Sequence, residues 1–104
     1  MSLNLTRLCG EVMERGALRY TPAGISVIEF RLLHRSEQIE AGALRKVECD
    51  MACVVLGDNA KLIAAITPGE QGSQVSVSGF LAARSLKHRS PVLHVNTIEF
   101  LEGN

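Results

Sequence analysis

The feature of this sequence that most constrains its fold is an alternation of apolar and polar residues with a period of two. Over residues 25–35, the apolar side chains of Ile28, Phe30 and Leu32 lie on one face of an extended chain, while charged residues fall largely on the other. This alternation predicts a strand with one buried face. Two further stretches repeat the pattern and predict two more strands, at residues 47–55 and 75–81.

Both ends of the chain are also rich in apolar and β-branched residues, which predicts strands over residues 3–13 and 92–101. Gly10 and Gly79 lie inside strand patterns, where glycine often marks a bulge or a sharp bend. One segment differs, because Asp58 can cap a short helix over residues 59–66 that Pro68 and Gly69 end. The remaining residues are predicted to form connections at 15–23, 36–44 and 85–91.

The order of these elements predicts an all-β fold. Five strands with one short helix between strands three and four are typical of the OB-fold, a five-stranded Greek-key barrel that holds oligonucleotides or oligosaccharides. Other small barrels remain open, although the place of the helix favours the OB-fold over an SH3-like barrel. The chain has 104 residues, too few for two separately cored halves, so a single OB-fold domain over 1–104 is expected.

Charge and cysteine content restrict the possible partners and location. Eleven basic and eleven acidic side chains give a formal net charge of zero, which excludes a protein that binds polyanions through bulk charge alone. The sequence shows neither a signal peptide nor an apolar run long enough to span a membrane. With an odd count of 3 cysteines, it is expected to be cytoplasmic with reduced thiols and no membrane association.

The sequence carries no phosphate-cradling glycine loop, nucleophile elbow or zinc-protease motif, so it predicts no enzyme and no cofactor. Cys49 and Cys53 are four residues apart in a predicted strand. That spacing separates them by about 13 Å, too far for two ligands of one zinc ion, so no metal site is expected. Both are instead interpreted as small buried thiols, in phase with Val47, Met51 and Val55.

Basic residues gather in one predicted loop. No acidic residue occurs between Glu70 and Glu99, and within this stretch lie Arg84, Lys87, His88 and Arg89. Other basic residues fall on the first loop and on strands two and three: Arg15, Arg19, Arg31, Arg35, Arg45 and Lys46. This distribution is typical of a groove that follows a phosphate backbone, although an ordinary solvated loop remains the alternative.

Aromatic side chains for base stacking are few, because the chain has no Trp, one Tyr and three Phe. Phe30 has the phase of a core residue. Phe80, which points outward in its predicted strand, and Tyr20 in the first loop are the two plausible stacking platforms.

The segment Phe30-Arg-Leu-Leu-His34-Arg35-Ser36-Glu-Gln38-Ile-Glu40-Ala41-Gly42, preceded by Pro22-Ala-Gly-Ile, resembles the primosomal replication protein N (PriB) family. The resemblance runs along the whole chain, with Gly10, Cys49, Gly79-Phe80 and Leu93-His94 in corresponding places. It implies a homodimer related to the bacterial single-stranded DNA-binding protein. Such a protein binds single-stranded DNA and helps the PriA helicase reload the replisome at stalled forks.

The resemblance also implies DNA contacts at Arg19, at Arg35 and in the loop from Arg84 to Arg89. At strand three the sequence departs from the family, because Glu48 and Ala43 stand where aromatic residues are typical. Single-strand binding is therefore expected to be weaker and more electrostatic than in relatives that carry the aromatics, and a protein-interaction module with incidental DNA contact is the alternative. The residues expected to bind DNA are Arg19, Arg35, Arg45, Lys46, Phe80, Arg84, Lys87, His88 and Arg89.

Overall fold

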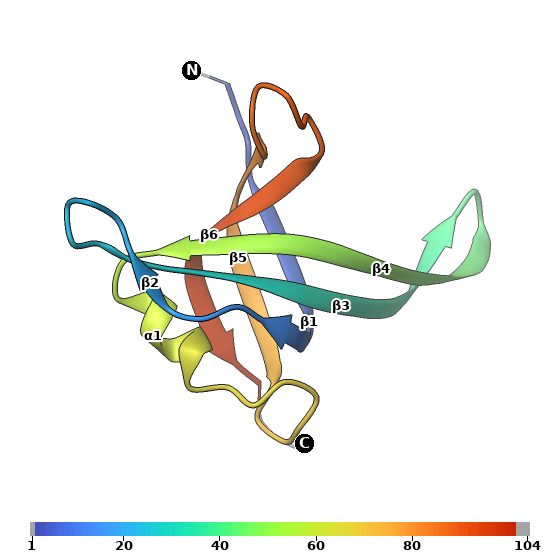
Figure 1. The fold of residues 1–104 in the computed structure, drawn as a ribbon. Helices are drawn as coiled ribbons and strands as arrows, with labels where there is room; N and C mark the ends of the chain where they lie inside the picture. Colours follow the sequence, from blue (N-terminus) through green and yellow to red (C-terminus); the bar gives the residue numbers. More distant parts are fainter. Residues whose placement is uncertain (1, 102–104) are drawn as a thin grey trace.

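The computed structural model describes residues 2–101 of the chain. It consists of strands with one small helix (Figure 1). The elements are β1 Thr6–Arg15, β2 Arg19–Tyr20, β3 Ser26–Glu40, β4 Ala43–Leu56, α1 Asn59–Ala64, β5 Gln74–Ala83 and β6 Pro91–Phe100. Within this range, no helix is long and apolar enough to cross a membrane.

The strands form one sheet that closes on itself. Their order is β1-β5-β6-β4-β3-β2, and a further pairing of β1 with β3 completes the barrel. All paired neighbours are antiparallel except β4 and β6, which run parallel. The helix α1 lies between β4 and β5 in sequence and packs against β3, β4 and β6. The predicted OB-fold is therefore confirmed.

The core consists of the apolar residues that the period-two alternation predicts on the buried face of each strand. Ile28, Leu32, Val55, Val77 and Leu93 are completely buried. Each such side chain contributes roughly 1.5–3 kcal/mol of stability relative to an exposed one. Phe30 and Cys53 join the same cluster, as the sequence predicts for both.

Gly79 and Gly10 allow close approaches between neighbouring strands. A Cβ atom at Gly79 would lie 1.8 Å from the carbonyl oxygen of His94, and the pairing of β5 with β6 shifts register between Ser78 and Gly79. The bulge predicted at this glycine is confirmed. At Gly10 a Cβ atom would lie 2.5 Å from the carbonyl oxygen of Leu33, next to the point where β1 leaves β5 and pairs with β3. Neither position has room for a side chain.

The connection predicted over residues 36–44 is wrong, because both strands continue through it. β3 runs to Glu40 and β4 begins at Ala43, with an unbroken antiparallel register between them. The turn consists of Ala41 and Gly42, both with positive φ (53° and 80°), as a tight two-residue hairpin requires. This hairpin projects from the barrel (Figure 1). With no core beneath it, neither face needs apolar residues, so the alternation that identifies a strand disappears.

Four smaller predictions also need correction. The first strand begins at Thr6 rather than at residue 3, and the first loop contains the short strand β2. The helix ends at Ala64, and the Asp58 side chain makes no capping hydrogen bond. Cys49 is exposed rather than buried, because it lies opposite His34 on the part of the hairpin that extends beyond the core.

Candidate nucleic-acid interface

The outer face of the barrel is formed by side chains that the strand register places side by side. Glu29 on β3 pairs with Val54 on β4, Val54 pairs with His94 on β6, and His94 pairs with Phe80 on β5. Paired residues point to the same face of a sheet. These four residues therefore form one row across the strands, on the opposite side from the core residues Ile28 and Val55.

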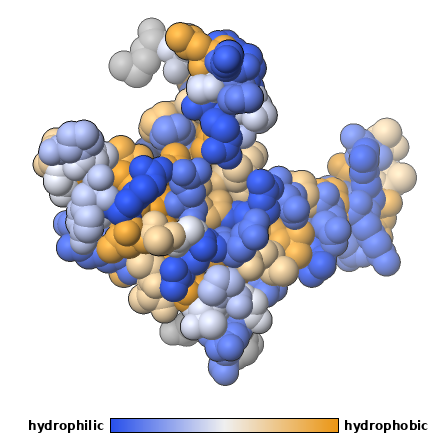
Figure 2. Space-filling view, viewed as in Figure 1, coloured by the Kyte–Doolittle hydropathy of each residue, from blue (hydrophilic) through white to orange (hydrophobic). Residues whose placement is uncertain are grey.

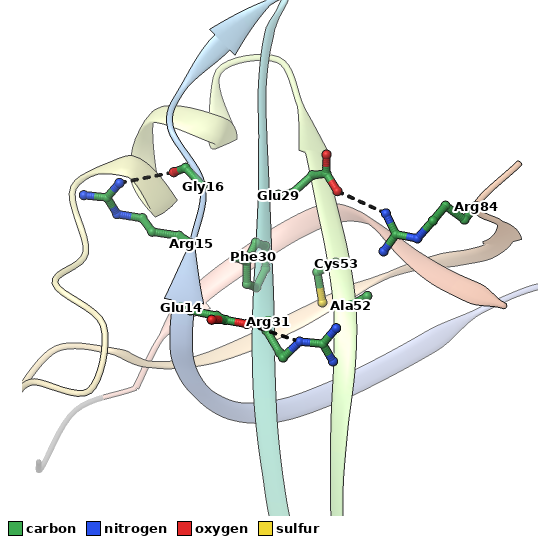
Figure 3. Close-up of a pocket in the computed structure, with 9 residues that line it drawn as sticks. All are labelled: Glu14, Arg15, Gly16, Glu29, Phe30, Arg31, Ala52, Cys53 and Arg84. Carbon is green, nitrogen blue, oxygen red and sulfur yellow. Dashed lines mark hydrogen bonds and ion pairs between the residues drawn. The ribbon is translucent and has the colours of Figure 1, made fainter. Parts of the chain in front are cut away.

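A groove of about 320 Å³ lies beside this row (Figure 3). Residues of β1, β3 and β4 line it, together with Arg84 after the end of β5. Arg31 of β3 forms an ion pair with Glu14 of β1 at 3.5 Å, and its side chain extends over Ala52 (Figure 3). Arg15 also lines the groove, and its guanidinium donates to the carbonyl oxygens of Ile66 and Gly16.

Glu29 bridges two arginines that belong to different parts of the fold. Its Oε2 accepts from Arg19 at 2.9 Å and its Oε1 accepts from Arg84 at 3.3 Å. Arg19 belongs to β2 and Arg84 begins the loop between β5 and β6. The hydrogen bond from Arg19 is the main cause that lowers the pKa of Glu29, and Arg84 lowers it further. The carboxylate therefore stays ionised at neutral pH.

The projecting hairpin carries two more paired arginines. Arg35 donates to Glu48 at 2.6 Å, and the hydrogen bond from this carboxylate raises the pKa of the guanidinium. Arg45 pairs with Glu40 near the tip. The register places Arg45 on the opposite face from Arg35, because Arg45 pairs with Gln38 whereas Arg35 pairs with Glu48. Hydrophilic residues cover much of the hairpin surface (Figure 2).

The loop over residues 84–90 is shaped by its own backbone. The amide of Arg84 donates to Ser90, the amide of Ser85 donates to His88, and the amide of His88 donates to the Ser85 hydroxyl. Lys87, His88 and Arg89 are all exposed. Among residues 2–101, neither Lys87 nor Arg89 forms an ion pair, so their charges are open to solvent and to ligands.

Phe80 lies on the outer face, as its phase predicts, and is 39% exposed. Its ring stacks on the imidazole of His94, with centroids 4.9 Å apart and planes 8° from parallel. Leu56 and Val54 lie next to this pair along a shallow groove. Tyr20, the other predicted platform, is exposed on β2. The outer face thus offers flat apolar surface between charged groups.

The structure brings together some of the residues expected to bind DNA and separates others. Arg19, Arg84 and the row ending in Phe80 share one face, and Arg35 with Lys46 continues it along the hairpin. Arg45 lies on the other face of the hairpin. Sequence reasoning missed Glu29 and His94, because their contacts with Arg19, Arg84 and Phe80 join different strands and loops and are set by the fold. The described residues 2–101 contain no group of His, Cys, Asp or Glu that could hold a metal ion.

Comparisons with known proteins agree with this architecture. The model of a family described as "another single-strand binding protein family" matches residues 4–97. Among solved structures, PriB from Ralstonia solanacearum superimposes with a TM-score of 0.83 at 30% identity, covering 97% of this chain and 100% of that one. A deletion mutant of the single-stranded DNA binding protein from Thermus aquaticus superimposes with a TM-score of 0.77 at 25% identity. This alignment covers 97% of this chain and 51% of that one. The fold is thus that of a single-strand-binding type of OB protein.

Sequence relatives narrow this class. Replication restart protein PriB of Bordetella pertussis is 39% identical over 98% of this chain and 92% of its own length. The protein of the same name from Nitrosomonas europaea is 35% identical over 88% of this chain and 82% of its own length. The chain therefore belongs to the PriB family.

Proposed function

We propose that this protein binds single-stranded DNA on the outer face of its barrel. The observation that carries the proposal is the exposed loop over residues 84–90, whose cations Lys87 and Arg89 have no carboxylate partner among the described residues. Arg84, at the start of this loop, lines the groove, and Phe80 lies on β5, the strand that leads into the loop. Neutralising phosphates releases condensed counterions and supplies affinity that does not depend on sequence, while a ring such as Phe80 can stack on any base.

The proposed contacts divide by chemistry. Phe80 supplies stacking, and the remaining contacts are with phosphates. Arg45 is not among them, because it lies on the other face of the hairpin. Exposed basic side chains on this face and in the loop provide the phosphate contacts: Arg19, Arg35, Lys46, Arg84, Lys87, His88 and Arg89. Since most of the arginines already have a carboxylate partner, binding is weak and depends strongly on salt. Phosphate contacts position the strand without reading bases, so little sequence preference is expected.

The experiment is a titration of end-labelled oligothymidylate of about 30 nucleotides, followed by fluorescence anisotropy at low salt, with a duplex of equal length as control. Preferential binding of the single strand supports the proposal, because only an unpaired strand can splay its bases onto Phe80. Equal affinity for both forms, or no binding at low salt, would reject it.

We also propose a role in replication restart, in which the protein stimulates the PriA helicase in the cytoplasm. The names of the relatives, replication restart protein PriB, support this role. The alternative is a module that holds the helicase while DNA contact is incidental, and the neutral Arg35–Glu48 pair on the hairpin favours it. An Arg35→Ala plus Lys87→Ala variant distinguishes them. Lost stimulation of unwinding supports a DNA-dependent role, and full stimulation supports the module.

A homodimer is the third part of the proposal. The hairpin of β3 and β4 that projects beyond the closed barrel leaves strand edges that pairing between subunits can cover. Leu3 and Leu5, just before β1, are 91% and 69% exposed, which also favours a covering partner. Light scattering tests this directly. A mass of twice 11.3 kDa is expected, and a monomeric mass at micromolar concentration would contradict it.

A further inference from the structure

The carboxylate of Glu29 lies between Arg19 and Arg84, whose guanidiniums form no other ion pair within residues 2–101. Each of its oxygens accepts from a different guanidinium, Arg19 at 2.9 Å and Arg84 at 3.3 Å. The three side chains come from β3, from β2, which pairs with β3, and from the loop after β5. All three remain between 43% and 57% exposed. The bridge is therefore open to solvent and to a ligand.

A phosphate group offers the same chemistry as this carboxylate. Both present anionic oxygens that match the fork of donors on a guanidinium, and both form charge-assisted hydrogen bonds with it. We propose that the space between Arg19 and Arg84 is a phosphate-binding site for a phosphodiester of single-stranded DNA, and that Glu29 occupies it in the free protein as an internal competitor. This inference rests on the proposed function, because it assigns a ligand to one part of the same surface.

The energetics permit the exchange. Exposed ion pairs stabilise a protein by only about 0–1 kcal/mol each, so a phosphate can displace Glu29 at modest cost. That cost still subtracts from the affinity for DNA. Glu29 is also a fixed negative charge beside the strand once it has been displaced. Both effects reduce what Arg19 and Arg84 contribute.

The second carboxylate in the groove does not offer the same bridge. Glu14 contacts a single arginine, Arg31, at the longer distance of 3.5 Å (Figure 3). Figure 3 also shows Glu29 and Arg84 directed toward each other from opposite sides of β4. Among the carboxylates described between residues 2 and 101, Glu29 is thus the one paired with two arginines.

The test uses the full chain with Glu29→Gln, and Glu99→Gln as a control with the same change in net charge. Glu99 lies on β6 opposite Ser76, outside the groove. The probes are oligothymidylate of about 30 nucleotides and an abasic strand of the same length. Glu29→Gln is expected to bind both about 3- to 10-fold more tightly at low salt, with a log–log salt slope steeper by up to about 1.4 for two added phosphate contacts. Glu99→Gln should change affinity less than about twofold, because Glu99 lies outside the groove and forms no ion pair with Arg19 or Arg84.

A variant that lacks both arginines shows whether the gain in DNA affinity depends on Arg19 and Arg84. In a protein carrying Arg19→Ala and Arg84→Ala, adding Glu29→Gln should give less than half of the gain, in logarithmic units, seen with both arginines present. An equal gain in both backgrounds would overturn the inference, because it would reflect net charge alone. Circular dichroism melting of every variant establishes that it is folded.

The outcomes separate this inference from the proposed function. If the wild type binds the single strand and Glu29→Gln binds equally or more weakly, the internal competitor is rejected while DNA binding stands. If neither protein binds, both fail. Binding by Glu29→Gln with none by the wild type would support the competitor in its strongest form.

Discussion

The outer strand face and the loop over residues 84–90 both carry cations, yet those cations are not equally available. On the strands, the register places a residue of the neighbouring strand opposite each side chain, and the partner of Arg35 is Glu48. In the loop, Lys87 and Arg89 have no strand beside them and no ion pair within residues 2–101. The number of basic residues on a surface therefore does not measure its capacity for phosphate. What matters is how many lack an internal anion.

The largest effect is expected from replacing the anion that neutralises Arg35. Glu48→Trp removes this carboxylate and adds a ring next to the same guanidinium. Because stacking of one base on an aromatic ring contributes about 1–3 kcal/mol, single-strand affinity should rise about 5- to 150-fold. Anisotropy titration with oligothymidylate measures it, and unchanged affinity would place Glu48 outside the binding surface.

Glu48→Gln is the matched control for that variant. It frees Arg35 but provides no ring, so its gain should be about that of one added phosphate contact, steepening the salt slope by about 0.7. A gain as large as that of Glu48→Trp would mean that stacking contributes nothing at this position.

The next largest effect should come from the loop. Lys87→Ala combined with Arg89→Ala removes two unpaired cations and should weaken binding about tenfold at low salt, since each lost phosphate contact lowers affinity and flattens the salt slope by about 0.7. Anisotropy titrations at one low salt concentration are sufficient to measure the tenfold loss of affinity. A loss of affinity below about twofold would show that the unpaired cations of the loop do not bind DNA better than the paired arginines of the strands.

Removing a complete ion pair from the hairpin should change little. Arg45→Ala combined with Glu40→Ala leaves the net charge unchanged and takes away a pair on the face opposite Arg35. Affinity should change by less than about twofold, because an exposed, mutually neutralised pair contributes little. A loss comparable with that of the loop variant would show that the strand wraps around both faces of the hairpin.

The smallest effect concerns stability and pH. Because Arg19 lowers the pKa of Glu29 below its ordinary value of 4.5, the folded state favours the ionised carboxylate. The bridge therefore stabilises the fold above about pH 4.5, by less than about 1 kcal/mol since it is half exposed, and this contribution disappears as the pH falls through the lowered pKa. Urea unfolding of the wild type and Glu29→Gln at pH 7, 5, 4 and 3 should give a difference that shrinks toward zero below pH 4. A constant difference across this range would contradict the assignment.

The barrel could be predicted because burial of one face of each strand produces an apolar–polar alternation with a period of two in the sequence. Ile28, Phe30 and Leu32 alternate since one face of β3 packs inside the closed barrel, and the position of α1 after the third long strand then favours one topology. The hairpin was not predictable from periodicity. Over residues 36–47 both faces meet solvent, and the strands persist through their hydrogen-bond ladder and the Ala41-Gly42 turn. A pattern that reports burial cannot detect strands that bury little.

The cations of the candidate site could be predicted from the sequence, but their ion-pair partners could not. The absence of acidic residues between Glu70 and Glu99 identifies the basic loop directly from the sequence. The partners of Arg84 and Phe80, in contrast, are Glu29 and His94, which are 55 and 14 residues away along the chain. The pairing of β5 with β6 places His94 beside Phe80, and the folded barrel places Glu29 beside Arg84, so the internal neutralisation of the arginines appears only in three dimensions.

The salt dependence of single-strand binding by the wild-type protein tests the central claim most directly. The log of the association constant for oligothymidylate, measured by anisotropy across about 20–200 mM salt, falls by about 0.7 per phosphate contact. If a few unpaired cations carry the affinity while most arginines remain neutralised, the slope should lie near −2 to −4. A slope near −6 would mean that the paired arginines engage phosphates fully. A slope near zero, or no binding at the lowest salt, would contradict a phosphate-led interface altogether.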